Sequence, residues 1–324
     1  MKKILIIRFS SIGDIVLTTP VIRCLKQQLG AEIHFLTKKR FRQVVNPNPY
    51  IDRVHAIDKK VSEVMPELKR IGFDHIIDLH RNLRSLQVKL ALRAPSHSFD
   101  KLNWQKWLMV RFKVNRLPDI HIVDRYLATT LPLGIQKDGQ GLDYFIPEAD
   151  EVDPATILPA NAKGYIAFVI GAAHATKRLP ESKIIAMCQK IAQPVILLGG
   201  PGEKEVGESI SAAAGEHVIN TCGSLRLHQS ASVVRQADKV ISHDTGLMHV
   251  AAAFQKEIVS IWGNTIPEFG MYPYYGTQPN RNTTQQVSHL SCRPCSKIGY
   301  QQCPKGHFKC MMEQEEEVLK IPLN

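Results

Sequence analysis

Short runs of apolar residues alternate with amphipathic stretches along the chain, a pattern that predicts strands alternating with helices. In the first half, the apolar runs that predict strands are residues 3–8, 32–36, 53–57 and 75–78. Between them, residues 18–29 and 62–71 carry apolar positions at helical spacing. This alternation is typical of βαβ units that share a parallel sheet.

The alternation restarts after residues 138–141 and a proline-spaced run, residues 147–159, that we interpret as loop and linker. The strands expected beyond it are residues 165–170, 195–198, 217–220, 240–242 and 258–261, and the expected helices are 181–192, 203–214 and 229–236. We therefore expect an α/β protein with two Rossmann-like domains, residues 1–160 and 161–324.

Composition narrows the function classes. The 324 residues include 44% hydrophobic residues, but no segment approaches the ~20 apolar residues of a membrane-spanning helix. The expected first strand already includes residue 5, which leaves no room for a signal peptide, so we expect a cytoplasmic protein. The net charge of +11 favours acidic partners such as anionic lipids or phosphorylated sugars. No nucleic-acid-binding module accompanies that charge.

The stretch 240–253 combines a strand, a polar turn and a helix, which is the geometry of an anion site. The free N–H groups of a helix start and the helix dipole attract phosphate. Gly246 would let a phosphate approach and Thr245 offers a hydroxyl, while His249 lies four residues after Thr245, so both can face the same ligand. The alternative is an ordinary N-cap formed by Asp244 or Thr245.

A second strand-to-helix turn follows residues 3–8 and contains Ser10, Ser11, Gly13 and Asp14. The two turns, with the block Trp262-Gly263-Asn264-Thr265-Ile266-Pro267 and the stretches 171–178 and 198–205, come in a fixed order over nearly the whole chain. Together they resemble glycosyltransferase family 9, the heptosyltransferases of lipopolysaccharide core assembly. The resemblance implies the GT-B fold, with the acceptor on the first domain and the nucleotide sugar on the second.

For the first domain, the resemblance implies that Asp14 is the catalytic base. A carboxylate can remove the proton of an attacking acceptor hydroxyl, and the alternative is that Asp14 caps the following helix. The expected acceptor-binding residues are Ser10, Ser11, Gly13, Arg81 and Arg84. Arg81 and Arg84 could also be ordinary surface residues. The aromatic and basic segment 99–116 is expected to form an amphipathic helix on the acceptor side.

For the second domain, the resemblance assigns Thr176 and Lys177 to phosphate contacts, where a cation would neutralise the leaving diphosphate. Glu205 resembles an acidic residue that binds the ribose hydroxyls of the nucleotide. Leu225 resembles a residue whose backbone contacts the nucleobase. Asp244, Thr245, Gly246 and His249 complete the expected donor site. The alternatives are a solvated basic turn at Lys177 and a helix start at Glu205.

The cysteines crowd the C-terminal tail, where Cys292, Cys295, Cys303 and Cys310 surround His307. Four thiolates and an imidazole can hold structural zinc, but the second pair lacks the tight spacing of a zinc ribbon. We expect no required cofactor and no catalytic metal, because cationic side chains and a helix N-terminus can carry the leaving charge. Structural zinc in the tail is the alternative.

These features predict an inverting glycosyltransferase that moves a heptose or similar sugar from a nucleoside-diphosphate sugar, with ADP-heptose as the expected donor. The expected acceptor is the lipopolysaccharide core at the inner membrane surface, where the protein would be peripheral. The alternatives are another GT-B sugar-nucleotide enzyme, such as an epimerase, and a non-catalytic protein that binds nucleotide sugar or glycolipid.

Overall fold

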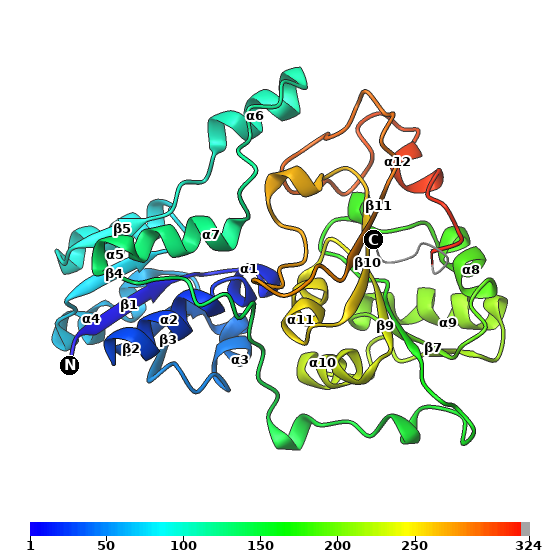
Figure 1. Cartoon of the computed structure of the whole chain (residues 1–324), viewed down its shortest axis with the longest axis horizontal. Coiled ribbons are helices and arrows are strands. Elements are labelled where there is room, and N and C mark those ends of the chain that lie inside the picture. Colours follow the sequence, from blue (N-terminus) through cyan, green and yellow to red (C-terminus); the bar gives the residue numbers. More distant parts are fainter. Residues whose placement is uncertain (319–324) are drawn as a thin grey trace. The chain divides into compact units, whose positions relative to one another are not determined.

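A computed structural model describes residues 1–318 of the chain. The chain is divided into two compact units (Figure 1). Unit 1 comprises residues 1–101, 120–145 and 276–278. Unit 2 comprises residues 102–119, 146–275 and 279 onward. The first unit thus ends its main segment at Phe145 rather than at residue 160, and residues 102–119 belong to the second unit.

Residues 3–98 of unit 1 form a five-stranded parallel sheet in the order β3-β2-β1-β4-β5. The strands are β1 (Lys3–Ile7), β2 (Glu32–Lys38), β3 (Arg53–Ile57), β4 (His75–Asp78) and β5 (Ser96–Ser98). The accompanying helices are α1 (Ile12–Val16), α2 (Thr19–Leu29), α3 (Arg42–Val45), α4 (Met65–Ile71), α5 (Leu83–Leu92) and α7 (Ile122–Leu127).

Residues 166–286 of unit 2 form a six-stranded parallel sheet in the order β11-β10-β9-β6-β7-β8. The strands are β6 (Ile166–Val169), β7 (Val195–Leu198), β8 (Val218–Asn220), β9 (Lys239–His243), β10 (Glu257–Trp262) and β11 (Asn282–Gln286). The helices are α6 (Asn103–Phe112), α8 (Glu181–Gln189), α9 (Lys204–Ala214), α10 (Leu227–Gln236), α11 (Gly246–Ala253) and α12 (Lys309–Met312).

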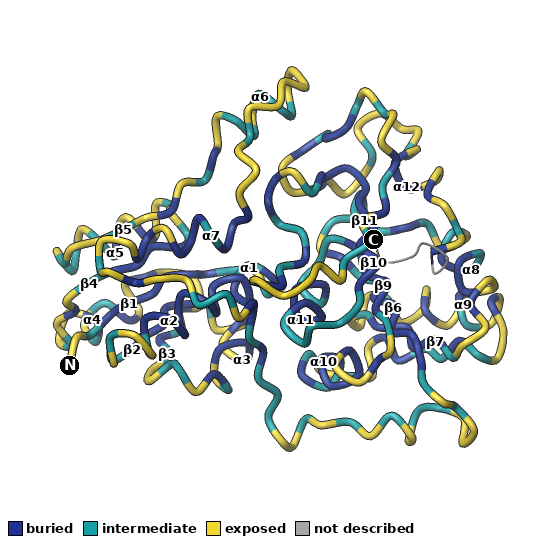
Figure 2. The backbone as a smooth tube through the Cα atoms, viewed as in Figure 1, coloured by how far each residue is buried: buried dark blue, intermediate teal, exposed yellow. Residues whose placement is uncertain are grey.

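The core of each unit lies along its central strands, which are buried on both faces (Figure 2). Successive strand residues point to opposite faces, so the burial of Ile4, Leu5, Ile6 and Ile7 means that both faces of β1 are covered. Continuous apolar strands of this kind are typical of parallel sheets packed between helices. The expected α/β class with two parallel sheets is confirmed.

The elements differ from the expected ones where local chemistry intervenes. The helix expected over residues 62–71 begins only at Met65, because Pro66 occupies its first turn and a short 3-10 turn precedes it. The helix at 18–29 begins at Thr19 and is preceded by the separate helix α1. Two polar strands, β5 and β11, carry no apolar run and extend the sheets beyond the expected strands.

Candidate functional site

The candidate residues gather at a recurring place in the topology. If strands are numbered within each unit, both sheets follow the order 3-2-1-4-5, continued by a sixth strand in unit 2. The strand order reverses between β1 and β4 in unit 1 and between β6 and β9 in unit 2. In open α/β sheets, ligands bind outside the carboxyl ends of the strands at this switch point. Asp14 and Arg81 follow β1 and β4, and Lys177 and Asp244 follow β6 and β9.

Asp14 lies in the third residue of α1 and is held from two sides. Its Oδ2 accepts hydrogen bonds from the backbone N–H of Ser11 at 3.0 Å and from the Ser11 hydroxyl at 2.8 Å. Its Oδ1 lies 2.6 Å from Nη2 of Arg8. The carboxylate therefore caps the start of α1 and forms an ion pair as well, so a cap and a reactive group are compatible at this position.

Arg8 is the residue that fixes this carboxylate. It is 8% exposed, and its Nε donates to the carbonyl of Ser10 at 2.8 Å. Its Nη1 donates to the carbonyl of Leu79 and, at 2.9 Å, to the hydroxyl of Tyr126. One buried guanidinium thus ties the ends of β1 and β4 to α7 and presents its remaining nitrogen to Asp14.

These contacts set the proton affinity of Asp14. Burial raises the pKa of the carboxyl, but the charge of Arg8 and the hydrogen bonds from Ser11 outweigh burial, so the pKa lies below its usual range. Asp14 is consequently ionised at neutral pH. An ionised, partly buried carboxylate at the end of a strand can accept a proton from a bound hydroxyl.

The loop after β4, the strand that neighbours β1, carries positive charge. Asp78 is fully buried and accepts from the backbone N–H groups of His80 at 3.0 Å and Arg81 at 2.7 Å. The Arg81 side chain is half exposed and donates to the carbonyl of Phe99 at 3.0 Å. Arg84 is exposed at the start of α5, where cations are available to an anionic ligand.

The charges around Asp14 include residues that sequence reasoning missed. Burial and then the charge of Arg8 lower the pKa of Lys101, and the same two causes lower the pKa of His80 to about 4. His80 also stacks edge-on with Phe9 at 5.1 Å between ring centroids. No local sequence signal marks the interaction of Lys101 and His80 with Asp14, because both residues are far from Asp14 along the chain.

In unit 2, Lys177 and Asp244 form an ion pair at the switch point. Nζ of Lys177 lies 2.6 Å from Oδ2 of Asp244, and the same oxygen accepts from the Thr265 hydroxyl at 2.9 Å. Both side chains of the pair are mostly buried, at 15% and 12% exposed. Three loops, after β6, β9 and β10, therefore converge on one carboxylate and place one ammonium group there.

The start of α11 adjoins this pair. Thr245 is the N-cap residue in extended conformation, but its side chain makes no capping hydrogen bond. The first N–H groups of α11, from Gly246 onward, are thus not capped by that hydroxyl and are suited to an anion. Thr245 and Gly246 are partly exposed, whereas His249 is 2% exposed within the helix. That His249 faces the same ligand as Thr245 stays a prediction, which rests on its position four residues after Thr245.

Thr176 has a different environment from the one expected. It is 2% exposed. Its Oγ1 donates to the carbonyl of Tyr300 at 3.0 Å and accepts a hydrogen bond from the Tyr300 N–H at 2.8 Å. Its hydroxyl is thus engaged with the C-terminal tail. In this arrangement Thr176 anchors the loop, and Lys177 is the residue of the pair that presents a charged group.

The tail also braces the loop after β10. Arg293 is buried and donates from Nη2 to the carbonyl of Thr265 at 3.0 Å and from Nε to the carbonyl of Gly263. The amide of Asn264 donates to the Ser296 hydroxyl at 3.1 Å. Residues 293–300 therefore hold the loops that carry Lys177 and Thr265.

Two further positions follow β7 and β8. Glu205 is exposed in the first turn of α9. Glu203, two residues earlier, accepts from the Gly200 N–H at 2.9 Å and lies 3.2 Å from Nη1 of Arg178. Its carboxylate thus connects the loops after β6 and β7. Leu225 is partly buried after β8, at the same sheet edge.

The cysteine-rich tail was a candidate metal site. Sγ of Cys292 lies 3.8 Å from Nε2 of His307, and Sγ of Cys295 lies 3.2 Å from the carbonyl of Cys292. Among residues 1–318, however, no group of three or more His, Cys, Asp or Glu side chains is arranged to hold a metal ion. Cys310 is buried in the core of unit 2.

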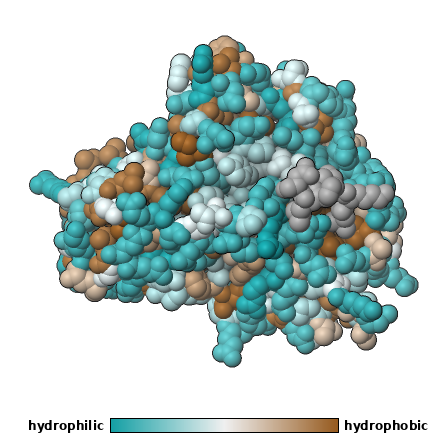
Figure 3. Space-filling view, in the orientation of Figure 1, coloured by the Kyte–Doolittle hydropathy of each residue, from teal (hydrophilic) through white to brown (hydrophobic). Residues whose placement is uncertain are grey.

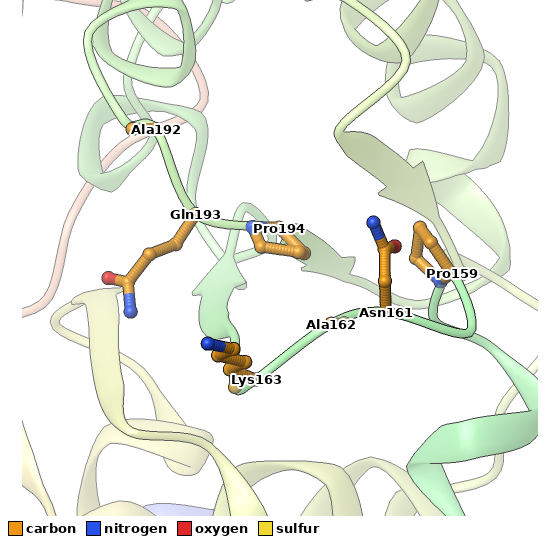
Figure 4. A pocket seen from close by; sticks show the side chains of 8 residues that line it. Pro159, Asn161, Ala162, Lys163, Ala192, Gln193 and Pro194 are labelled. Atoms are coloured by element: carbon orange, nitrogen blue, oxygen red, sulfur yellow. The ribbon is translucent and has the colours of Figure 1, made fainter.

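A pocket of about 310 Å³ lies elsewhere in unit 2 (Figure 4). Its lining includes Asn161, Lys163, Gln193 and Pro194, which precede β6 and β7. It therefore opens at the amino ends of these strands, the edge opposite the candidate loops. Because ligands of parallel sheets bind at the carboxyl ends, we do not assign the donor to this pocket. In the described part of the chain, no helix is both long and apolar enough to span a bilayer.

Comparisons with known proteins agree with the geometry. The model of glycosyltransferase family 9 (heptosyltransferase) matches residues 61–305. Lipopolysaccharide heptosyltransferase 1 of Pseudomonas aeruginosa is 25% identical over 323 residues, covering 91% of this chain and 86% of the relative. Lipopolysaccharide heptosyltransferase 1 of Campylobacter coli is 24% identical over 291 residues, covering 81% of this chain and 84% of the relative.

Solved structures share the fold. A family 9 glycosyltransferase from Veillonella parvula has a TM-score of 0.70 at 23% identity, covering 87% of this chain and 85% of its own. ADP-heptose heptosyltransferase II of Escherichia coli has a TM-score of 0.69 at 20% identity, covering 99% of both chains. The expected GT-B class, with two Rossmann-like domains, is thus confirmed. The chain is a glycosyltransferase that belongs to family 9, the heptosyltransferase family.

Proposed function

We propose that this enzyme transfers a heptose from ADP-heptose to a lipopolysaccharide core acceptor, with inversion at the anomeric carbon. The single observation that carries the proposal is the ionised Asp14 carboxylate fixed by Arg8 and Ser11 at the switch point of unit 1. The donor and acceptor classes rest on relatives named lipopolysaccharide heptosyltransferase and on a solved E. coli heptosyltransferase with ADP.

In the proposed step, Asp14 removes the proton of the acceptor hydroxyl while that oxygen attacks the anomeric carbon. The new glycosidic C–O bond forms as the bond between the anomeric carbon and the diphosphate breaks. The electron pair of the broken bond leaves with ADP, and the proton remains on Asp14. Attack on the face opposite the leaving group inverts the anomeric centre.

The leaving diphosphate needs positive charge, which the loops of unit 2 supply. Lys177 carries an ammonium group, and the N–H groups at the start of α11, beside Thr245 and Gly246, add fixed dipoles. We therefore propose that no metal or other cofactor is required. The Lys177–Asp244 ion pair would open to share the ammonium with the diphosphate. Thr176 and Asp244 support this site, and Glu203 joins Glu205 as a candidate for the ribose hydroxyls.

On unit 1, the acceptor would be held by positive charge. Arg81 and Arg84 follow β4, and Ser10, Ser11 and Gly13 form the loop that carries Asp14. Phosphate or carboxylate groups on the acceptor would pair with the two guanidinium groups. We propose that the reaction takes place at the inner face of the cytoplasmic membrane, where the protein is peripheral.

The test is product analysis with ADP-heptose labelled in the sugar, with and without a heptose-free lipopolysaccharide acceptor. We expect labelled acceptor and free ADP only when both substrates are present. Asp58→Asn, an exposed carboxyl outside the site, serves as the matched control for variants at Asp14. An altered nucleotide sugar without acceptor would indicate an epimerase, and binding without turnover a non-catalytic protein. Either result would refute the proposal.

A further inference from the structure

Helix α6 exposes more aromatic surface than its length would lead one to expect. It buries none of its residues, and Figure 2 draws it without a buried segment. Trp104 is 64% exposed, Trp107 is 42% exposed and Phe112 is 57% exposed. Large aromatic side chains are normally buried, where they stabilise protein cores and interfaces. A helix that presents three of them to solvent is therefore suited to an interface.

The three rings form one continuous surface. Trp104 and Trp107 stack with 4.9 Å between centroids, and Trp107 meets Phe112 edge-on at 5.2 Å. Residues three, four and seven apart share a helix face, so Arg111 lies on the same side as Trp104 and Trp107. Hydrophobic surface is visible in the region of α6 (Figure 3). We call this face, with the exposed residues that follow it to Arg116, the aromatic–basic face.

The charge of this segment has one sign. Residues 101–118 contain five basic residues and no acidic residue. Lys113 donates to the carbonyls of Cys292 and Pro294, at 3.0 and 2.6 Å, and so ties the end of α6 to the tail. Arg111 and Arg116 are exposed, and the residues next to each of them in the sequence are uncharged. The face thus combines indole rings with guanidinium groups.

This combination selects one class of partner. Indole rings prefer the boundary between lipid headgroups and acyl chains, and arginine side chains next to them pair with anionic headgroups. A second copy of the chain fits poorly, because a symmetric contact would bring together two faces that both carry only positive charge. An anionic bilayer satisfies both the rings and the charges.

We propose that the aromatic–basic face docks onto an anionic phospholipid bilayer, with Trp104, Trp107 and Phe112 inserted at headgroup depth and Arg111 and Arg116 paired with lipid phosphates. The inference rests on the proposed location of the enzyme at the membrane and assigns a surface to it. Because lipid docking involves neither Asp14 nor Lys177, binding and sugar transfer can be measured separately.

The experiment is co-sedimentation of the full chain with vesicles of pure phosphatidylcholine or of phosphatidylcholine with 30% phosphatidylglycerol. We expect binding to the anionic vesicles and a blue shift of tryptophan emission. The chain contains three tryptophans, and Trp262 is buried, so the shift reports on α6. Trp104→Ala/Trp107→Ala should abolish binding, and Arg111→Gln/Arg116→Gln should weaken it about thirtyfold.

The matched control is Leu90→Ala/Leu131→Ala, which removes two exposed apolar side chains from unit 1 and should leave vesicle binding unchanged. Circular dichroism confirms folding, and light scattering gives the mass in solution. Transfer to a detergent-dispersed acceptor should stay at the parental level in every variant. Loss of transfer with retained vesicle binding would refute the proposed function alone.

Three results would overturn the docking proposal. The first is equal binding of the parent and a folded Trp104→Ala/Trp107→Ala variant. The second is a folded parent that does not bind anionic vesicles. The third is a dimer in solution that the same double variant converts to a monomer, because the face would then be covered by a second copy.

Discussion

Arg8 and Asp14 form an ion pair at the end of β1, with 2.6 Å between Nη2 and Oδ1. The guanidinium is buried and the carboxylate partly so, and the pair lies where the strand order of unit 1 reverses. The contact keeps the proposed base ionised but also makes it a weaker proton acceptor than an isolated buried carboxylate. The proposed base thus owes its charge at neutral pH to a neighbouring side chain.

Replacing Arg8 should shift the acid limb of the pH–rate profile. Without the guanidinium, burial remains and raises the pKa of Asp14, so activity should decline at a higher pH than in the parent. We expect Arg8→Met to move the limb upward by at least one pH unit and Arg8→Lys to move it less. A profile of kcat against pH decides the matter, and an unshifted limb in folded Arg8→Met would contradict the assignment of Asp14.

Asp14→Asn should abolish turnover and retain donor binding. The amide keeps the shape of the side chain but cannot take the proton, so kcat should fall by about 10²–10⁴-fold. Calorimetric titration with ADP should give the parental affinity, because the donor is proposed to bind unit 2. Turnover within a few-fold of the Asp58→Asn control would mean that Asp14 serves only as a helix cap.

Lys177→Met should weaken ADP binding. The ammonium group is the charged donor at the switch point of unit 2, and loss of a charge-assisted hydrogen bond costs about 1.5–3 kcal/mol. That corresponds to a roughly 10- to 150-fold increase in Kd. Lys190→Met, which removes a lysine paired with Glu316, is the control. Equal ADP affinity in both variants would place the diphosphate elsewhere.

His243 should make stability depend on pH. Its Nε2 accepts from the Leu179 N–H at 3.0 Å, and burial lowers its pKa to about 4. The unfolded chain, with a histidine pKa near 6.5, binds the proton first as pH falls, so stability is lost between about 6.5 and 4. Between these two pH values, the free energy of unfolding should fall by about 3 kcal/mol because of this histidine. Glutamine does not titrate, so His243→Gln should remove this pH dependence. Urea unfolding at pH 7.5 and pH 4 should therefore show a smaller pH dependence in the variant.

Metal removal should leave the reaction intact. The charges proposed to stabilise the diphosphate belong to Lys177 and the start of α11, so dialysis against a chelator should change neither kcat nor Tm. Elemental analysis of the purified protein is the accompanying measurement. Near-stoichiometric zinc, together with loss of stability on chelation, would instead assign the tail cysteines to a structural metal.

The strands of both sheets could be predicted where apolar residues run continuously, as in Lys3–Ile7 and Val195–Leu198. The polar strands Ser96–Ser98 and Asn282–Gln286 could not, because each lies at a sheet edge and pairs with only one neighbour. Their hydrogen bonds depend on the adjacent strand rather than on local side-chain chemistry.

The site divides in the same way. Asp14 and Lys177 could be named because the family resemblance covers the turns that carry them, whereas the turns alone also fitted a helix cap and a solvated basic turn. The partners could not, since Tyr126 reaches Arg8 from 118 residues away and Tyr300 reaches Thr176 from 124 residues away. The acidic residues after β7 illustrate this limit. Glu203 and Glu205 are two residues apart, and the sequence does not show that Glu203 is the one that accepts a hydrogen bond from the N–H of Gly200, just before α9.

The bond between Thr176 and Tyr300 also sets an order of events during synthesis. A ribosome adds about 5–20 residues per second, so Tyr300 is made roughly 6–25 s after Thr176. Until then the loop that carries Lys177 lacks its anchor, and the last strand of unit 2, which ends at Gln286, is made before that anchor. A nascent chain is therefore able to complete both sheets before the loops of the proposed donor site are anchored. A chain that ended before Arg293 would contain every strand but lack the contacts that hold those loops.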